Sequence, residues 1–275
     1  MTQILIGLFA LLTSCWAMAE GSVPSCYDSK IQTPNAKPAI ELFVVIDQTT
    51  LLDSNLKQAV ADQIRPFLKA GQGFSVLVFS AYTQGKYTQL LATGQLDPLL
   101  PMAQRNDISK PVLAKFDQCI AQQPALAAQA VGSALRNAFE GASAGLAKSD
   151  IWASLKDISG KVRQSPATDK VVFLVSDMLE NSSVSSFYAN QAVRKIDPAH
   201  ELQIAVSNQL VGDFGGARLY VIGAGLLNLL EPKANAQYRD PKTMQALATF
   251  WRSYFDKSQA QLVEFGMPAL LNQIK

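Results

Sequence analysis

The strongest constraint on the fold is a series of short, mostly apolar runs spaced along the chain. They cover residues 40–46, 74–79, 171–175 and 219–222, and they are rich in β-branched and aromatic side chains. Such runs are typical of strands buried on both faces of a parallel sheet, because a half-exposed strand would alternate polar and apolar residues. The chain is therefore expected to build a sheet covered by helices on both faces.

The segments between these runs supply the helices. Leu56, Val60 and Ile64 recur at helical spacing, and a C-terminal helix is expected over residues 241–257. Strands that alternate with helices predict an α/β fold with a doubly wound, mostly parallel sheet. Two weaker strands, an antiparallel edge strand at 87–92 and a last edge strand at 262–265, complete it. Further helices are expected at 126–139, 152–162, 187–195 and 198–210, and a long loop at 96–123.

Composition places the chain among globular proteins. Hydrophobic residues make up 48% and charged residues 17% of the 275 residues, and the formal net charge is +2. Lys and Arg do not cluster in the sequence, so nucleic acid is not an expected partner. No stretch after the N-terminal leader is apolar for long enough to cross a bilayer.

The N-terminal residues resemble an export signal. Residues 4–12 form an apolar run, and Ala17-Met18-Ala19 presents the small residues that a signal peptidase reads, which predicts a signal peptide at 1–19 and cleavage before Glu20. The alternative is a lipobox at residues 12–15, which would make Cys15 a lipid anchor. Residues 20–39 are then an extended segment and 40–275 one domain. The expected location is the periplasm or the outside of the cell, or the envelope membrane if Cys15 is lipidated.

Two cysteines remain once the leader is removed. An even pair in an oxidising compartment most simply forms a disulfide, so Cys26 and Cys119 are expected to be bonded.

Acidic residues close two of the apolar runs. Asp47 follows the run at 40–46, and Asp177 follows the run at 171–175. Ligands bind outside the carboxyl ends of strands in such sheets, where the strand order reverses. A buried aspartate is costly unless something compensates it, and Mg²⁺ accepts carboxylates, hydroxyls and water. The sequence thus favours a site at this edge.

The order of these residues resembles a von Willebrand factor A domain. Asp47-Gln48-Thr49-Thr50-Leu51 is similar to the Asp-x-Ser-x-Ser opening of that family's metal-ion-dependent adhesion site. The residues at 148–155 resemble the entry to its third helix, and Val175-Ser176-Asp177 its last acidic position. The resemblance runs from about residue 40 to about residue 265.

The resemblance implies a set of metal ligands and a mode of binding. The ligands would be Asp47, Thr49, Ser149 and Asp177, holding Mg²⁺, or Mn²⁺ or Ca²⁺. The family leaves the cation incompletely ligated, so that an acidic side chain of another envelope protein can complete its shell. The chain departs from the motif at Leu51, which replaces a ligating hydroxyl.

Four neighbouring side chains are candidates for contact with a partner at the same rim. They are Thr50, Met178, Glu180 and Asn181. Ser149 also has a simpler role open to it, as the N-cap of the helix that follows.

Other functions compete with a metal-dependent binding module. One is a metal-free scaffold with a decayed site. Another is a Mg-dependent phosphatase of haloacid dehalogenase type, but Thr49 stands where that family needs a second aspartate. Histidine-based catalysis is not expected, because His200 is the only histidine and lies in a polar helical stretch. The chain is expected not to be an enzyme.

Overall fold

A computed structural model describes residues 23–31, 37–83, 86–143, 149–189, 192–227 and 240–275. The expected signal peptide and Cys15 lie outside these residues. The strands are β1 (Ile40–Asp47), β2 (Gly73–Thr83), β3 (Lys86–Gln95), β4 (Asp169–Val175), β5 (Tyr188–Ala189), β6 (Ala192–Val193), β7 (Ala217–Ile222) and β8 (Ala260–Phe265). The helices are α1 (Ser54–Ile64), the 3₁₀ turn η1 (Arg65–Phe67), α2 (Met102–Arg105), α3 (Lys110–Glu140), α4 (Ile151–Gln164), α5 (Pro198–Ser207) and α6 (Pro241–Lys257).

The main sheet has six strands in the order β3-β2-β1-β4-β7-β8. Every neighbouring pair is parallel except β2 and β3, which are antiparallel. The predicted doubly wound α/β fold with one antiparallel edge strand is confirmed. The chain builds outward from β1 in one direction and from β4 in the other, so the strand order reverses between these two central strands.

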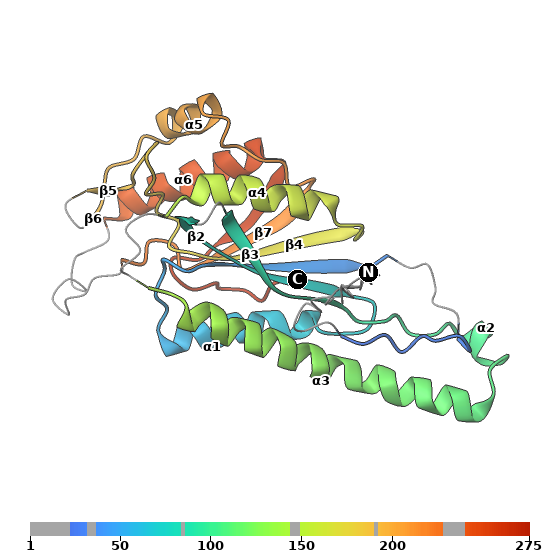
Figure 1. Cartoon of the computed structure of the whole chain (residues 1–275). Coiled ribbons are helices and arrows are strands. Elements are labelled where there is room, and N and C mark those ends of the chain that lie inside the picture. The colour runs from blue at the N-terminus through green and yellow to red at the C-terminus, as the bar shows by residue number, and fades with distance from the viewer. Residues whose placement is uncertain (1–22, 32–36, 84–85, 144–148, 190–191, 228–239) are drawn as a thin grey trace, which may run out of the picture.

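Helices cover the sheet on both faces (Figure 1). Alternate side chains of β1 point to opposite sides, as strand geometry requires. Phe43 and Val45 pack in one hydrophobic cluster with α4 and α6. Leu42, Val44 and Ile46 pack in the other with α1 and α3. Both faces of the central strands are thus buried, which explains why their sequences are nearly all apolar.

Helix α3 extends well beyond the sheet, and α2 lies near its far end (Figure 1). Residues 23–31, 98–109 and 110–120 form a small lobe there, which we call the distal lobe. It has a hydrophobic cluster of its own, built on Tyr27, Ile31, Leu100 and Phe116. The predicted disulfide is confirmed, because Cys26 and Cys119 are bonded in this lobe.

The prediction of a long loop at 96–123 is wrong for the second half of that range, because α3 begins at Lys110. Pro111 lies in the first turn, where its missing N–H costs nothing. Weak periodicity hid the helix, because its outer turns bury few side chains. Packing on Tyr27 and the bond to Cys26 hold these turns instead.

The helix expected at 187–195 is also wrong. Phe187 is fully buried, its N–H donates to the Glu180 carbonyl (2.7 Å), and Arg194 returns an N–H to the Phe187 carbonyl (2.9 Å). Arg194 also forms an ion pair with Glu201 (2.6 Å). These contacts, made with segments on either side, override the local helical spacing.

The remaining expectations for secondary structure hold. The aromatic residues Trp152, Trp251 and Tyr254 are core residues, and His200 is exposed on α5. Of the helices in the described ranges, none combines the length and apolar character needed to cross a membrane.

Candidate functional site

The candidate site lies where the strand order reverses, at the carboxyl ends of β1 and β4. Asp47 is the last residue of β1, and Asp177 lies two residues beyond the end of β4. The parallel register pairs Ile46 with Val175, which places the residues after them side by side. Folding therefore brings the two predicted aspartates together, although they are far apart in the sequence: Asp47 lies 129 positions before Ser176, the residue that precedes Asp177.

Asp47 is almost fully buried and accepts four hydrogen bonds. Its Oδ1 accepts from the backbone N–H (2.9 Å) and the hydroxyl (2.6 Å) of Thr49. Its Oδ2 accepts from the hydroxyls of Ser176 (2.8 Å) and Ser149 (3.4 Å). A carboxylate offers about four lone-pair sites, so this one is satisfied by the protein itself.

Asp177 is held next to this group by contacts from three segments. Its Oδ1 accepts from the Leu179 N–H (2.8 Å) and its Oδ2 from the Tyr188 hydroxyl (2.8 Å). Its own N–H donates to the Thr50 hydroxyl (3.0 Å), and its carbonyl accepts from the Gly225 N–H (2.8 Å). The turn containing Gly225 closes over the carboxyl end of β4.

Gly223 allows that close approach. It has a φ of 100°, and a Cβ built on it would lie 3.0 Å from the Ser176 carbonyl oxygen. The sequence Gly223-Ala224-Gly225 is therefore a strand-end turn, and it forms one wall of the site.

Burial and mutual repulsion raise the proton affinity of the pair. Burial raises the pKa of Asp47, and the hydrogen bonds from Thr49, Ser176 and Ser149 oppose that shift. Burial and the neighbouring charge of Asp47 raise the pKa of Asp177 to about 8. The pKa of Tyr188 is raised by burial and by the charge of Asp177. Burial and mutual repulsion thus favour the protonated form of the pair, and a bound cation would relieve the same repulsion.

Ser149 joins the cluster but is not a helix cap. The N-cap position of α4 belongs to Asp150, and its side chain makes no capping hydrogen bond. The Glu180 carboxylate caps the helix instead, by accepting the Trp152 N–H (2.9 Å). Ser149 and Asn181 exchange backbone hydrogen bonds of 3.0 Å in both directions. Ser149 is therefore fixed to the loop that follows β4.

Three of the four residues expected to contact a partner are buried. Thr50, Met178 and Glu180 are each 3% exposed or less, so the prediction of partner contact is wrong for them. Thr50 binds the Asp177 backbone, Met178 packs in the core, and Glu180 caps α4. Asn181 is partly exposed, and its contact with a partner stays a prediction.

Two residues of the cluster escaped sequence reasoning. Ser176 precedes Asp177 directly, and a hydroxyl at the end of an apolar strand was the signal that could have identified it. Tyr188 lies in the segment expected to be a helix, and nothing in its local sequence indicates that its hydroxyl reaches Asp177.

The stability of the protein is expected to fall as the pH rises from 6 to 9. Burial raises the pKa of Glu180 to about 8, from 4.5, and that of Asp177 to about 8, from 3.8. Between these values the native state binds more protons than the unfolded chain, so each unit of pH lowers the free energy of unfolding. This contribution is complete below about pH 4 and is lost as the pH passes 8. Urea midpoints measured at pH 6 and 9 test it.

A neutral isostere separates the contribution of Glu180. Glu180→Gln keeps an oxygen that can accept the Trp152 N–H but has no proton to lose, so its urea midpoint should fall less between pH 6 and 9 than that of the wild type. Glu140→Gln changes an exposed carboxyl on α3 and is the matched control. Equal pH slopes in all three proteins would contradict the assignment.

Comparison with known proteins shows likeness to solved structures only. No family model and no curated protein matches the sequence. Among solved structures, the chain is similar to an aerotolerance-related membrane protein from Bacteroides fragilis NCTC 9343 that carries multiple mutations to serines. The match has 11% sequence identity and a TM-score of 0.34, and it covers 83% of this chain and 92% of the other. A likeness at this level carries no argument about the site or the function.

Proposed function

We propose that this chain is a protein-binding module of the bacterial envelope, of von Willebrand factor A type, with its binding face at the carboxyl edge of the sheet. The observation that carries the proposal is the convergence of Asp47, Asp177 and three hydroxyls at the point where the strand order reverses. Ligand sites of open α/β sheets occur at this place. The order of the motif residues along the chain and the Cys26–Cys119 disulfide support the family type and an oxidising location.

The residues present fit a hard divalent cation in the kind of donors they offer. Within the described ranges, His, Cys, Asp and Glu side chains do not gather in groups of three or more that could hold a metal. The cluster instead offers two carboxylates with the hydroxyls of Thr49 and Ser149, and Mg²⁺ takes carboxylates together with neutral oxygens. The repulsion that raises the pKa of Asp177 is what a bound cation would relieve.

In this proposal Asp47, Thr49, Ser149 and Asp177 would hold Mg²⁺ or Mn²⁺. When bound, the cation would supply an open position for an acidic side chain of the partner. Leu51, which is 43% exposed, lies where the motif would add a further hydroxyl. Leu51 cannot ligate a cation, so the site would have one protein ligand fewer than the motif. We therefore expect weak affinity for the cation.

A second candidate function is a metal-free binding module with the same face. The four hydrogen bonds that Asp47 accepts favour it, because they satisfy this carboxylate without a cation. A proton on Asp177 would then lower the charge of the pair, and the raised pKa of Asp177 favours this. Both candidates are binding functions. The phosphatase of haloacid dehalogenase type is not favoured, since Thr49 occupies the position where that family needs a second aspartate as general acid.

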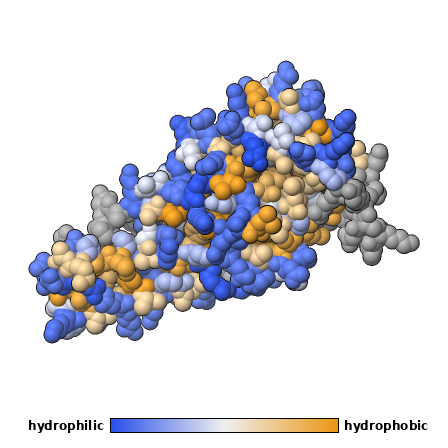
Figure 2. All heavy atoms as spheres, turned by 180° about the vertical axis from the view of Figure 1, so that it is seen from behind, coloured by the Kyte–Doolittle hydropathy of each residue, from blue (hydrophilic) through white to orange (hydrophobic). Residues whose placement is uncertain are grey.

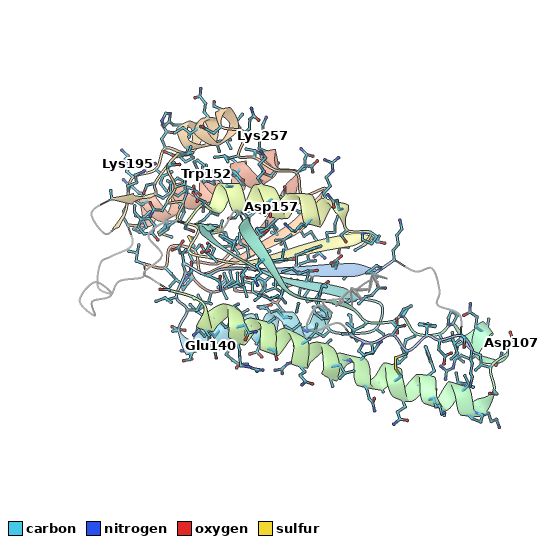
Figure 3. All side chains as sticks on the ribbon, in the orientation of Figure 1. Asp107, Glu140, Trp152, Asp157, Lys195 and Lys257 are labelled. Carbon is cyan, nitrogen blue, oxygen red and sulfur yellow. A yellow bond between two sulfur atoms is a disulfide. The ribbon has the colours of Figure 1, made fainter. Side chains whose placement is uncertain are left out.

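Cation binding is expected to depend on Asp177 and on pH. Titration calorimetry with MnCl₂ should give saturable heat with the wild type, and the affinity should be higher at pH 8.5 than at pH 7, because the cation competes with the proton on Asp177. Asp177→Asn removes the negative charge while keeping the size of the side chain, so it should abolish the heat. Asp107→Asn, at the exposed tip of the distal lobe, is the control (Figure 3).

The outcomes of this titration separate the two candidates. Heat that is absent from the wild type, or equal in the wild type and Asp177→Asn, removes the metal and leaves the metal-free module. Retention of a partner from envelope extract, measured with and without chelator, should then be insensitive to the chelator. A partner that binds Asp177→Asn and Leu51→Glu as well as the wild type would contradict the binding face itself.

A further inference from the structure

A cavity of about 430 Å³ lies in the distal lobe, between residues 25–31 and the first turns of α3. This volume is within the usual range for binding pockets. Its apolar lining comes from Tyr27, Ile31, Val112 and Phe116, together with the disulfide between Cys26 and Cys119. The cavity belongs to the lobe's own hydrophobic cluster and not to either core of the sheet.

The walls of this cavity are held rigidly. The rings of Tyr27 and Phe116 meet edge to face at 5.0 Å, and the Tyr27 hydroxyl donates to the Pro98 carbonyl (2.9 Å). Arg105 binds Asp117 through two nitrogens, at 2.9 and 2.7 Å. The cavity is thus preformed, and a ligand would not have to order it first.

The base of the lobe is fixed to the rest of the protein by buried polar contacts. The Gln123 amide donates to the Pro24 carbonyl (2.8 Å) and to Asp97 (2.9 Å), and it accepts from the Asp97 N–H (2.8 Å). These bonds tie the N-terminal segment, the end of β3 and α3 together. The lobe therefore projects from the sheet on a base that these hydrogen bonds hold in place.

The rim of the cavity is positively charged. Lys30 comes from one wall and Lys115 from the other, and both are exposed. In the part of the chain that the structure describes, neither ammonium group has an ion-pair partner. Among the described residues that line the cavity, Asp28 is the one carboxylate, and it accepts the backbone N–H groups of Lys30 (2.7 Å) and Ile31 (3.2 Å). Asp28 is therefore held within its own turn, and with the two lysines it leaves the rim a net charge of +1.

We propose that the distal lobe binds an acidic, apolar segment of a partner protein. An apolar side chain of that segment would pack in the cavity against Tyr27 and Phe116, and carboxylates on either side of it would meet Lys30 and Lys115. Cations on two opposite walls suit a chain that crosses the cavity, whereas an amphiphile with one head group needs its cations at one end.

Further apolar side chains of the same lobe are exposed to solvent. Leu99 is 69% and Met102 is 78% exposed, beside the buried Leu100 of the lobe's cluster. Viewed from behind, the projecting lobe at the lower left shows apolar surface among hydrophilic side chains (Figure 2). Exposed apolar surface of this kind marks interaction sites. This surface is separate from the carboxylate cluster and does not depend on it.

A labelled peptide tests the proposal directly. The probe is a fluorescein-labelled octapeptide with a Leu-Phe pair flanked by two glutamates, and the comparison peptide has lysines in place of the glutamates. Fluorescence anisotropy should show saturable binding of the acidic peptide only. Lys30→Glu with Lys115→Glu should weaken that binding at least tenfold. Chelator and Asp177→Asn should leave it unchanged, which separates this surface from the proposed metal site.

A charge-matched variant guards against a general electrostatic effect. Lys195→Glu with Lys257→Glu makes the same change of net charge near α5 and α6, far from the lobe (Figure 3). Its affinity for the acidic peptide should equal that of the wild type. Equal losses in both double variants, or equal binding of the two peptides, would overturn the proposal. Binding of phosphatidylglycerol vesicles through Lys30 and Lys115, without binding of the peptide, would also overturn it.

Discussion

Replacing Trp251 by alanine should lower the free energy of unfolding by about 3–5 kcal/mol, the usual loss when a buried tryptophan is truncated. Trp251 is fully buried on α6, and its ring lies 5.0 Å from that of Phe250 and 5.6 Å from that of Phe255. Truncation would leave a large cavity among these rings, because the surrounding helices and sheet can only partly collapse into it. Urea unfolding of the two proteins at pH 7 measures the difference.

The same substitution should disturb the candidate site. The Trp251 indole N–H donates to the Met178 carbonyl (2.8 Å), and Met178 follows Asp177 directly with a φ of 60°. A non-glycine residue in this region of φ is held there by its surroundings. Loss of the indole therefore removes a contact that holds the loop after β4 in place.

A phenylalanine at this position separates packing from hydrogen bonding. Trp251→Phe keeps most of the ring contacts but leaves the Met178 carbonyl without its donor, which should cost about 1–3 kcal/mol. Any metal binding of the site should weaken in this variant as it does in Trp251→Ala. A loss below about 1 kcal/mol for Trp251→Ala would mean that α6 does not pack on the sheet as described.

Removal of the disulfide should have an effect of similar size. The bond closes a loop with a sequence separation of 93, for which the chain-entropy model gives about 4–5 kcal/mol. Replacing Cys26 and Cys119 by serine should lower the free energy of unfolding by about this amount. Urea unfolding of protein that starts at Glu20 measures it without interference from Cys15.

Chemical reduction provides the control for that experiment. Wild-type protein treated with a reductant should unfold at the same urea concentration as the double serine variant, and the reductant should not affect the variant. The loss should also loosen the distal lobe, because Tyr27 and Phe116 are held together next to the bond. If oxidised and reduced wild type unfold together, the bond does not constrain the chain.

Much of the candidate site could be predicted from the sequence, because its residues follow apolar strands. A parallel strand has its carboxyl end at a known edge of the sheet, so Asp47 and Asp177 could be assigned to one edge without coordinates. Thr49 follows Asp47 within two residues and shares its position. Ser149 was assigned to the site through a resemblance to a known motif. The structure places its hydroxyl 3.4 Å from the Asp47 Oδ2 atom.

The partners of these residues could not be predicted, because long-range contacts choose them. Tyr188 reaches Asp177 from a segment whose local spacing favours a helix, and Glu180 caps a helix that begins 29 residues before it in the chain (Ile151). Burial of Thr50, Met178 and Glu180 likewise depends on α4, α6 and the turn at Gly223 closing over them. The residues next to each of these positions in the sequence give no indication of which distant segments will cover it.

The sequence alone determined the sheet, its helical layers and the edge at which the acidic residues lie, because these depend on the local pattern of apolar side chains and on the rules of parallel strand connection. Only the tertiary structure decided that hydroxyl groups donate hydrogen bonds to both carboxylates, that α3 projects beyond the sheet, and that its far end lines a partly open cavity. These features depend on hydrogen bonds and packing between segments distant in the chain, and such contacts leave no periodic pattern in the sequence.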